Sequence, residues 1–130
     1  MSEARGELVR VKIAKARDFL VMAEFAGEGY FDPAVSLAVS AAVNASDALC
    51  IIATGGFPSG DRHADAAGLL RKAGYSQAGT HLARVLAVKN KAQYSVTRCS
   101  ERDAVDAIKH AQRLLDQAVD QASDKGFLGG

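Results

Sequence analysis

Apolar residues recur along this chain at alternating steps of three and four positions, the spacing that places them on one face of an α-helix. The pattern is clearest over residues 35–52. Its apolar positions are Val35, Ala38, Ala42, Ala45, Leu49 and Ile52. A similar series occurs within residues 3–28, at Val9, Ile13, Ala16, Leu20 and Ala23. Both segments are therefore predicted to be helices that bury one side.

Glycines and capping residues divide the chain into five predicted helices. These span about 3–28, from Asp32 to Gly55, about 62–73, about 76–94, and from Ser100 to Gly126. Asp32 is expected to cap the second helix, with Pro33 in its first turn. Ser100 and Asp103 have the spacing of a capping box at the start of the fifth helix. A glycine follows the first, second, third and fifth of these predicted helices, and each of these glycines would stop the helix before it.

No segment alternates apolar and polar residues with the period of two that a half-buried strand requires. Of the 130 residues, 48% are hydrophobic, two are proline and none is tryptophan, a balance that favours helix over strand. Four long helices and one short helix, joined by short loops, predict an all-α fold, an antiparallel up-and-down helical bundle. We expect a single domain over residues 1–130, with a frayed end at 126–130.

The sequence shows no export or membrane signal. The stretch MSEARGELVRVK lacks the apolar core of a signal peptide. The apolar segment 34–53 is interrupted by polar residues such as Asp47, which makes it a poor transmembrane span. Cys50 lies on an apolar stripe and is expected in the core, and no disulfide with Cys99 is expected without export signals. We therefore expect a cytoplasmic protein with no membrane partner.

Positive charge is concentrated in one segment. No acidic residue occurs between Ala66 and Ser100. The same segment holds Arg71, Lys72, Arg84, Lys89, Lys91 and Arg98. Helical spacing would align four of its polar residues on one face, namely His81, Arg84, Lys91 and Ser95. Such a strip would attract phosphates or an acidic partner surface, and the alternative is a solvated face that meets acidic neighbours within the fold.

A line of polar residues interrupts the most apolar predicted helix. Ser40, Asn44 and Asp47 follow one another at steps of four and three. Buried polar groups must find hydrogen-bond partners, so these three could contact another helix, a second subunit or one of the basic residues. The three side chains could simply form hydrogen bonds within the fold, or they could hold a functional arginine or lysine in place.

No metal or cofactor site is expected. His63, His81 and His110 lie on three different predicted helices, and no further histidine or cysteine stands at metal-ligand spacing. The glycine-rich fragments follow no strand, so none forms a phosphate loop. No Ser/His/Asp arrangement can be identified from spacing.

Most of the chain resembles the HEPN domains (higher eukaryotes and prokaryotes nucleotide-binding). KARDFLVMAEFAGEGYFDPAVSLAVSAAVNASDALCIIATG looks like the family's first two helices and the turn between them. DRHADAAGLL resembles its short third helix, and LARVLAVKNKAQYS followed by DAVDAIKHAQRLLDQA resembles its last two. The resemblance implies a small helical bundle, often a homodimer, encoded in many cases beside a nucleotidyltransferase-fold partner in toxin–antitoxin or defence modules.

The resemblance also implies where a catalytic motif would lie. Catalytic HEPN domains are metal-independent ribonucleases, with an arginine, a polar residue and then a histidine on the fourth helix. Here the matching stretch is KNKAQYSVTR, in which Lys89 replaces the arginine, Asn90 matches the polar residue and Tyr94 stands near the histidine position. Lys89 lacks the bidentate fork of arginine. Tyr94 is a poor general base at neutral pH, so phosphate binding survives these substitutions better than catalysis does.

Three functions follow from these patterns. The favoured one is a non-catalytic HEPN-like domain that binds RNA, nucleotide or a partner protein through its basic fourth helix. Its candidate binding residues are His81, Arg84, Lys89, Asn90 and Lys91. The alternatives are a structural or interaction module of antitoxin type, and a metal-independent ribonuclease with Lys89, Asn90 and Tyr94 as catalytic candidates. In this last case His63 or His81 would assist.

A homodimer is expected from the residues as well as from the resemblance. The second helix carries apolar residues on more faces than a small bundle needs. The additional positions are Leu37, Ala41, Ala48 and Ile51. A second subunit would cover this additional apolar surface.

Overall fold

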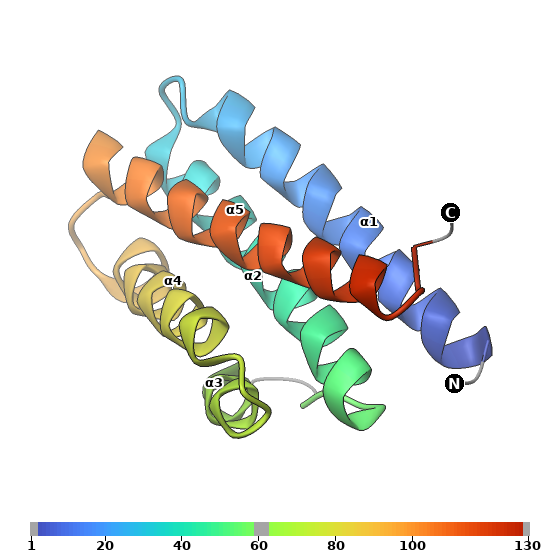
Figure 1. Ribbon diagram of the computed structural model, residues 1–130. Helices are drawn as coiled ribbons and strands as arrows, with labels where there is room; N and C mark the ends of the chain where they lie inside the picture. The colour runs from blue at the N-terminus through green and yellow to red at the C-terminus, as the bar shows by residue number, and fades with distance from the viewer. Residues whose placement is uncertain (1–2, 59–62, 129–130) are drawn as a thin grey trace.

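A computed structural model describes residues 3–58 and 63–128 of the chain, and all its regular elements are helices (Figure 1). The helices are α1 (Glu3–Ala26), α2 (Phe31–Thr54), α3 (His63–Lys72), α4 (Ser76–Tyr94) and α5 (Glu101–Asp124). The prediction of an all-helical fold is confirmed. Residue 62, where the third helix was expected to begin, lies outside the described residues.

Helix α2 is the centre of the molecule. It packs against each of the other helices, and Figure 1 shows it running through the middle of the structure between α1 and α4. The predicted stripes of α1 and α2 are buried. The additional apolar residues Ala41, Ala48 and Ile51 are also fully buried, by other helices of the same chain, whereas Leu37 is half-buried. The surface of α2 that suggested a second subunit is therefore mostly filled within one chain.

Small side chains allow this close packing. Eleven of the buried residues of α2 and α5 are alanine, which also has the highest helix propensity. Ala38, Ala42 and Ala45 have no exposed surface, and neither have Ala107 and Ala111 on α5. Alanine at a helix contact lets the two backbones approach, while leucines and isoleucines fill the space between contacts.

The stop signals after α2 and α3 and the start signal of α5 act as the sequence predicted. Gly55 follows α2 and Gly74 follows α3, both with the positive φ angles of 89° and 94° that favour glycine. At the start of α5, the Ser100 Oγ accepts the Asp103 N–H at 3.1 Å. The Asp103 carboxylate accepts the Ser100 N–H at 2.9 Å, which completes the predicted capping box.

The predicted role of Asp32 is wrong. Helix α2 begins at Phe31, and its N-cap residue Tyr30 makes no side-chain capping bond. The Asp32 carboxylate instead accepts the N–H of Cys99 at 2.9 Å, from a residue 67 positions away. This hydrogen bond lowers the pKa of Asp32 and ties the loop between α4 and α5 to the start of α2.

The end of the chain also differs from the frayed segment that was expected from residue 126 onward. Phe127 is buried, and its carbonyl accepts a hydrogen bond from the Arg10 guanidinium at 3.1 Å. The Phe127 ring lies against the position where a Gly6 side chain would begin. Residues 126–128 are thus anchored on α1, and residues 129–130 lie outside the described part.

The apolar character of α2 has a structural explanation. By length and composition alone it could cross a membrane, but 72% of its most apolar window is buried inside the bundle. A helix that other helices surround must be apolar on several sides. The composition of α2 is therefore that of a core helix.

Candidate functional site

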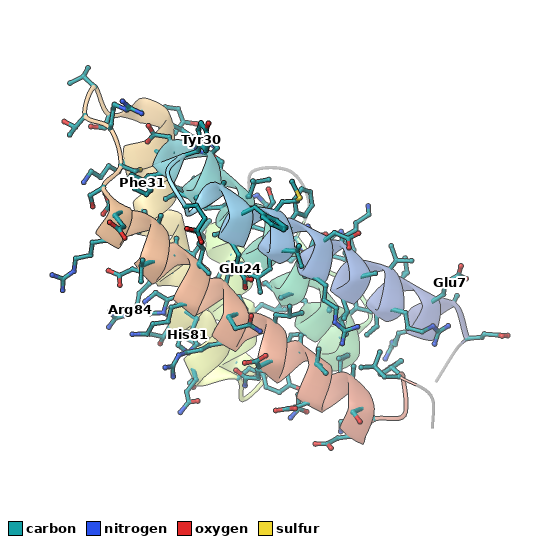
Figure 2. The ribbon with its side chains drawn as sticks, turned by 90° about the horizontal axis from the view of Figure 1, so that it is seen from above. Glu7, Glu24, Tyr30, Phe31, His81 and Arg84 are labelled. Atoms are coloured by element: carbon teal, nitrogen blue, oxygen red, sulfur yellow. The ribbon has the colours of Figure 1, made fainter. Side chains whose placement is uncertain are left out.

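The basic residues of α4 point to different sides of the helix. Arg84 is exposed and lies with His81 on the side next to α5, as Figure 2 shows. Lys91 is held by α5, because its ammonium group pairs with the Asp103 carboxylate at 2.8 Å. Lys89 is half-buried and lines a hollow with residues of α2. The strip expected from helical spacing is therefore divided between two surfaces.

Two histidines join α4 to α5. The Nδ1 atoms of His81 and His110 lie 2.9 Å apart, and their rings are tilted by 39° with centroids 5.2 Å apart. Such a hydrogen bond requires one Nδ1 to donate and the other to accept, so at least one ring must be neutral. While this hydrogen bond remains, the two rings together carry at most one positive charge.

Three cations surround this pair. Burial, together with Arg113, Arg84 and Lys109, lowers the pKa of His81. Burial also lowers the pKa of His110, with contributions from His81, Arg84 and Lys109. We call these five residues, His81, Arg84, Lys109, His110 and Arg113, the basic cluster. Like charges repel at this range, so an anion placed among them would relieve the repulsion.

Carboxylates lie near one outer member of the basic cluster, because Lys109 lines a hollow with Glu24, Glu28 and Glu101. Arg84, Lys109 and Arg113 are exposed, and none of them forms an ion pair with a described carboxylate. Asp106 raises the pKa of His110, although less than the cations lower it. A hollow lined by Ser76, Gln77, Thr80, His81 and Arg113 adjoins the cluster. Hydroxyl and amide groups in this hollow could donate hydrogen bonds to an oxyanion.

A second hollow brings Lys89 together with part of the predicted polar line. Its polar lining consists of Ser36, Ser40, Asn44, His63, Lys89 and Gln93. Phe19, Val39 and Val43 form its apolar part, and no carboxylate lines it. We call it the Lys89 groove. One basic residue of α4 therefore lines the same hollow as Ser40 and Asn44, and His63 contributes from the start of α3.

Asn44 and Asp47 of the polar line have different partners. Asn44 donates to the Ser40 carbonyl on its own helix at 2.8 Å. Asp47 is 6% exposed and pairs with Lys12 of α1 at 3.0 Å. Burial raises the pKa of Asp47, and the hydrogen bond from Lys12 opposes that shift. Lys12 also lies 4.4 Å from the centroid of the Phe57 ring. Asp47 therefore connects α2 to α1 rather than to the basic residues of α4.

The catalytic candidates do not converge. Lys89 is half-buried in its groove, whereas Asn90 is exposed and the Tyr94 side chain is 77% exposed. Helical spacing places Tyr94 about 140° around α4 from Lys89, so the two side chains leave the helix in different directions. Tyr94 is not among the residues that line the hollow containing Lys89.

The contribution of α5 to the basic cluster was not among the predictions from the sequence. Lys109, His110 and Arg113 occur in the short stretch KHAQR, where positions 109 and 113 share one side of a helix. This spacing was the available signal. Nothing in the sequence, however, indicated that His110 would face His81 across two helices.

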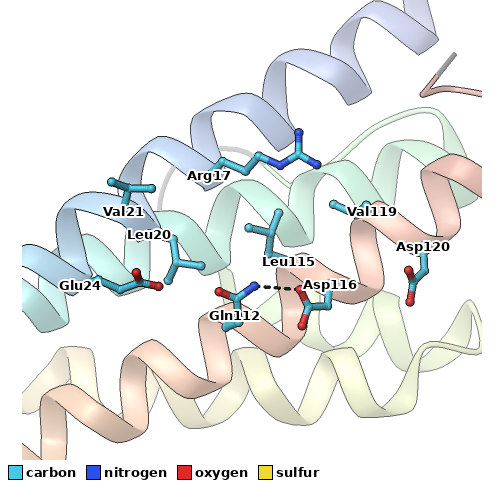
Figure 3. A pocket seen from close by; sticks show the side chains of 9 residues that line it. All are labelled: Arg17, Leu20, Val21, Glu24, Gln112, Leu115, Asp116, Val119 and Asp120. Carbon is cyan, nitrogen blue, oxygen red and sulfur yellow. Dashed lines mark hydrogen bonds between the residues drawn. The ribbon is translucent and has the colours of Figure 1, made fainter.

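A hollow on another side of the bundle has the opposite charge. Figure 3 shows it between α1 and α5, with Glu24, Asp116 and Asp120 against the single cation Arg17. The Gln112 amide donates to the Asp116 carboxylate at 2.8 Å, which keeps that carboxylate oriented in the hollow. This acidic hollow would repel phosphate groups, whereas the basic cluster would attract them.

Comparison with known proteins adds no assignment. The chain matches no protein-family model, and a search of curated proteins finds no match. Within residues 3–58 and 63–128, no group of three or more His, Cys, Asp or Glu side chains is arranged to hold a metal ion. The candidate sites are therefore defined only by the positions and charges of the residues described above.

Proposed function

We propose that this chain is a divergent, non-catalytic HEPN-like domain that binds the phosphate groups of RNA or a nucleotide through α4, with α5 completing the site. The observation that carries the proposal is the basic cluster. It places Arg84, Lys109 and Arg113 around the His81–His110 pair without an ion-paired carboxylate.

The basic cluster would gain electrostatic stability when an anion binds to it. Without a ligand, the three cations repel one another. Burial lowers the pKa of both histidines, and Arg84 and Lys109 lower both pKa values further. A phosphate beside Arg84 and Arg113 would offset that repulsion, and each guanidinium can donate two parallel hydrogen bonds to it. The negative charge would also raise the pKa of His110, so binding is expected to favour protonation and to strengthen as pH falls from 8 to 6.

The strength of binding should depend steeply on salt. Contacts with two or three phosphates of single-stranded RNA give a slope of log K against log salt of roughly −1.4 to −2.1. An anisotropy titration of a fluorescent single-stranded RNA at several salt concentrations measures this slope. A mononucleotide and inorganic phosphate in the same assay separate recognition of a strand from recognition of a single phosphate.

Two variants test the location of the site. Arg84→Ala with Arg113→Ala removes both exposed guanidiniums, and we expect at least a tenfold loss of affinity and a shallower salt slope. Arg17→Ala is the matched control, because Arg17 lines the acidic hollow on α1 and α5. The proposal fails if the wild-type protein does not bind RNA or nucleotide, or if Arg17→Ala weakens binding as much as the double substitution.

Several broader features belong to the same proposal. The arrangement of four long helices and one short helix as an antiparallel up-and-down bundle is supported by the helix lengths and by short connections such as that between α1 and α2. We place the domain in the cytoplasm. We further propose a role in a toxin–antitoxin or defence module with a nucleotidyltransferase-fold partner, which co-purification with the product of a neighbouring gene would test.

A second function, metal-independent RNA cleavage, is favoured by one observation. Lys89 and His63 line the same groove together with Ser40 and Asn44, so a cation and an imidazole could act on one substrate. Cleavage of RNA in the presence of a chelator would support this function if it disappeared in His63→Ala. Tyr94→Phe should leave that activity unchanged, because Tyr94 lies outside the groove.

A further inference from the structure

Helix α1 carries a second apolar stripe on its outer side. Leu8, Val11, Met22 and Phe25 are 47%, 43%, 54% and 69% exposed, respectively. Two charged and exposed residues, Lys15 and Asp18, complete the series. The six positions follow one another at steps of three, four, three, four and three. We call this set the outer stripe, and its spacing is that of the facing positions in a coiled coil.

The outer stripe lies opposite the side of α1 that enters the core. At about 100° per residue, its centre lies roughly 160° around the helix from the stripe formed by Val9, Ile13 and Leu20. A helix with two partly apolar sides has one more than the bundle requires, and large exposed apolar side chains aligned on one side indicate an interaction site. Packing within the chain covers the corresponding additional residues of α2, but it leaves this side of α1 uncovered.

The outer stripe is complementary to itself when its direction is reversed. Its midpoint falls between Ala16 and Arg17, and the positions on either side of that point are spaced symmetrically. An antiparallel copy therefore places Leu8 opposite Phe25 of the partner subunit and Val11 opposite Met22 of the partner subunit. At the centre, Lys15 faces the partner subunit's Asp18, and the same pair forms a second time because the arrangement is two-fold symmetric.

We propose that this protein forms a homodimer through antiparallel pairing of α1 with α1 of a second copy, in the register that pairs Lys15 with Asp18. The charges select this arrangement. In a parallel pair, each Lys15 would face a lysine and each Asp18 an aspartate, and like charges opposite each other are destabilising. Neither Lys15 nor Asp18 forms an ion pair with another described residue of its own chain.

The surface beside the centre of the outer stripe is shaped to receive a partner. A hollow there is lined by Lys15, Asp18, Phe19, Met22, Leu37 and Asn44. Phe19 and Leu37 are half-buried, so a partner helix would complete their burial. Leu37 is also the one additional apolar residue of α2 that the monomer leaves partly open. The dimer surface therefore extends from α1 onto α2.

The dimer would also border the Lys89 groove. Phe19 and Asn44 line both that groove and the hollow at the centre of the outer stripe. A partner helix seated on the outer stripe would therefore stand at one edge of the groove. The basic cluster on α4 and α5 does not share residues with this surface, so dimerisation and phosphate binding at the basic cluster are separable.

A charge swap tests the register. Lys15→Asp alone places a carboxylate opposite Asp18 of the partner subunit twice per dimer, and Asp18→Lys alone places two ammonium groups opposite Lys15. We expect the wild-type protein to be dimeric by sedimentation velocity. Both single variants should dissociate at concentrations at least tenfold higher than the wild type. The variant that combines Lys15→Asp with Asp18→Lys should recover dimerisation. All of these positions are exposed in the monomer, so circular dichroism should show unchanged helix content.

Controls and a second measurement complete the test. Val21→Asp is the matched control, because Val21 is exposed on α1 outside the outer stripe, and it should leave the dimer intact. Under oxidising conditions, Leu8→Cys combined with Phe25→Cys should give disulfide-linked dimers, whereas Leu8→Cys alone should not. A monomeric wild-type protein overturns the proposal. Failure of the charge swap to recover dimerisation, or efficient linkage by Leu8→Cys alone, overturns the antiparallel register.

Discussion

Two glycines in neighbouring helices provide a paired test of the packing. Gly68 lies in α3 and Gly79 lies in α4. A Cβ atom built on Gly68 has no neighbour within 4 Å. A Cβ atom on Gly79 would lie 2.9 Å from the Ala67 carbonyl oxygen and 3.0 Å from the Arg71 Cγ. The same substitution should therefore have opposite effects at the two positions.

The magnitudes follow from helix propensity and from the contact. Replacing glycine by alanine inside an exposed helix stabilises the folded state by about 0.8–1 kcal/mol, and Gly68→Ala should gain that amount. Gly79→Ala gains the same propensity, but its methyl group would press on a backbone oxygen that moves only if α3 moves. Overpacking of this kind costs about 1–3 kcal/mol. We therefore expect Gly79→Ala to be less stable than Gly68→Ala by about 1–3 kcal/mol.

Urea denaturation followed by circular dichroism measures both free energies of unfolding. A difference of 1 kcal/mol corresponds to roughly 3–5 °C in melting temperature for a domain of this size, so thermal unfolding gives an independent comparison. Equal stabilisation by the two substitutions would refute the close contact between α3 and α4. A loss of stability in Gly68→Ala would refute the assignment of that residue to an exposed helix position.

Three further predictions concern the core, the α5 cap and the histidine pair. Leu49 has no exposed surface, so Leu49→Ala should lower the free energy of unfolding by about 2–5 kcal/mol in urea denaturation. Ser100→Ala removes the hydroxyl that accepts the Asp103 N–H and should lower the free energy of unfolding by about 1 kcal/mol. An unchanged free energy of unfolding would show that the capping box is dispensable. The folded-state pKa values of His81 and His110 lie below the unfolded value near 6.5, so the native state binds fewer protons in that window. The free energy of unfolding should therefore be constant above about pH 7 and fall as the pH drops below about 6.5. His110→Gln should make this fall shallower. An unchanged pH profile in that variant would contradict the assignment of the fall to the histidine pair.

Helix boundaries and core positions could be predicted because they depend on nearby residues. Gly55 and Gly74 stop their helices through a local backbone conformation, and Ser100 begins α5 through a bond to a residue three positions away. The apolar stripes were equally legible, since a residue on a periodic apolar face is buried whichever helix covers it. These parts of the fold required no knowledge of how the helices pack.

The site was only partly predictable because it depends on helix rotation. Lys89 and Lys91 are two positions apart, yet one enters a groove on α2 and the other pairs with α5. Asp32 has the sequence context of a capping residue, but its carboxylate accepts a hydrogen bond from the N–H of Cys99, 67 positions away. Long-range partners of this kind leave no local pattern.

The amino-acid sequence by itself determined that this protein is helical, where most helices begin and end, and which side of each is apolar. Tertiary structure alone decided which polar groups meet: His81 with His110, Asp47 with Lys12, and Lys89 with Asn44 across one groove. The physical reason is that local hydrogen bonds and apolar periodicity specify a helix and its buried face. The chemistry of a site depends on the distance between side chains of different helices, which only their packing sets.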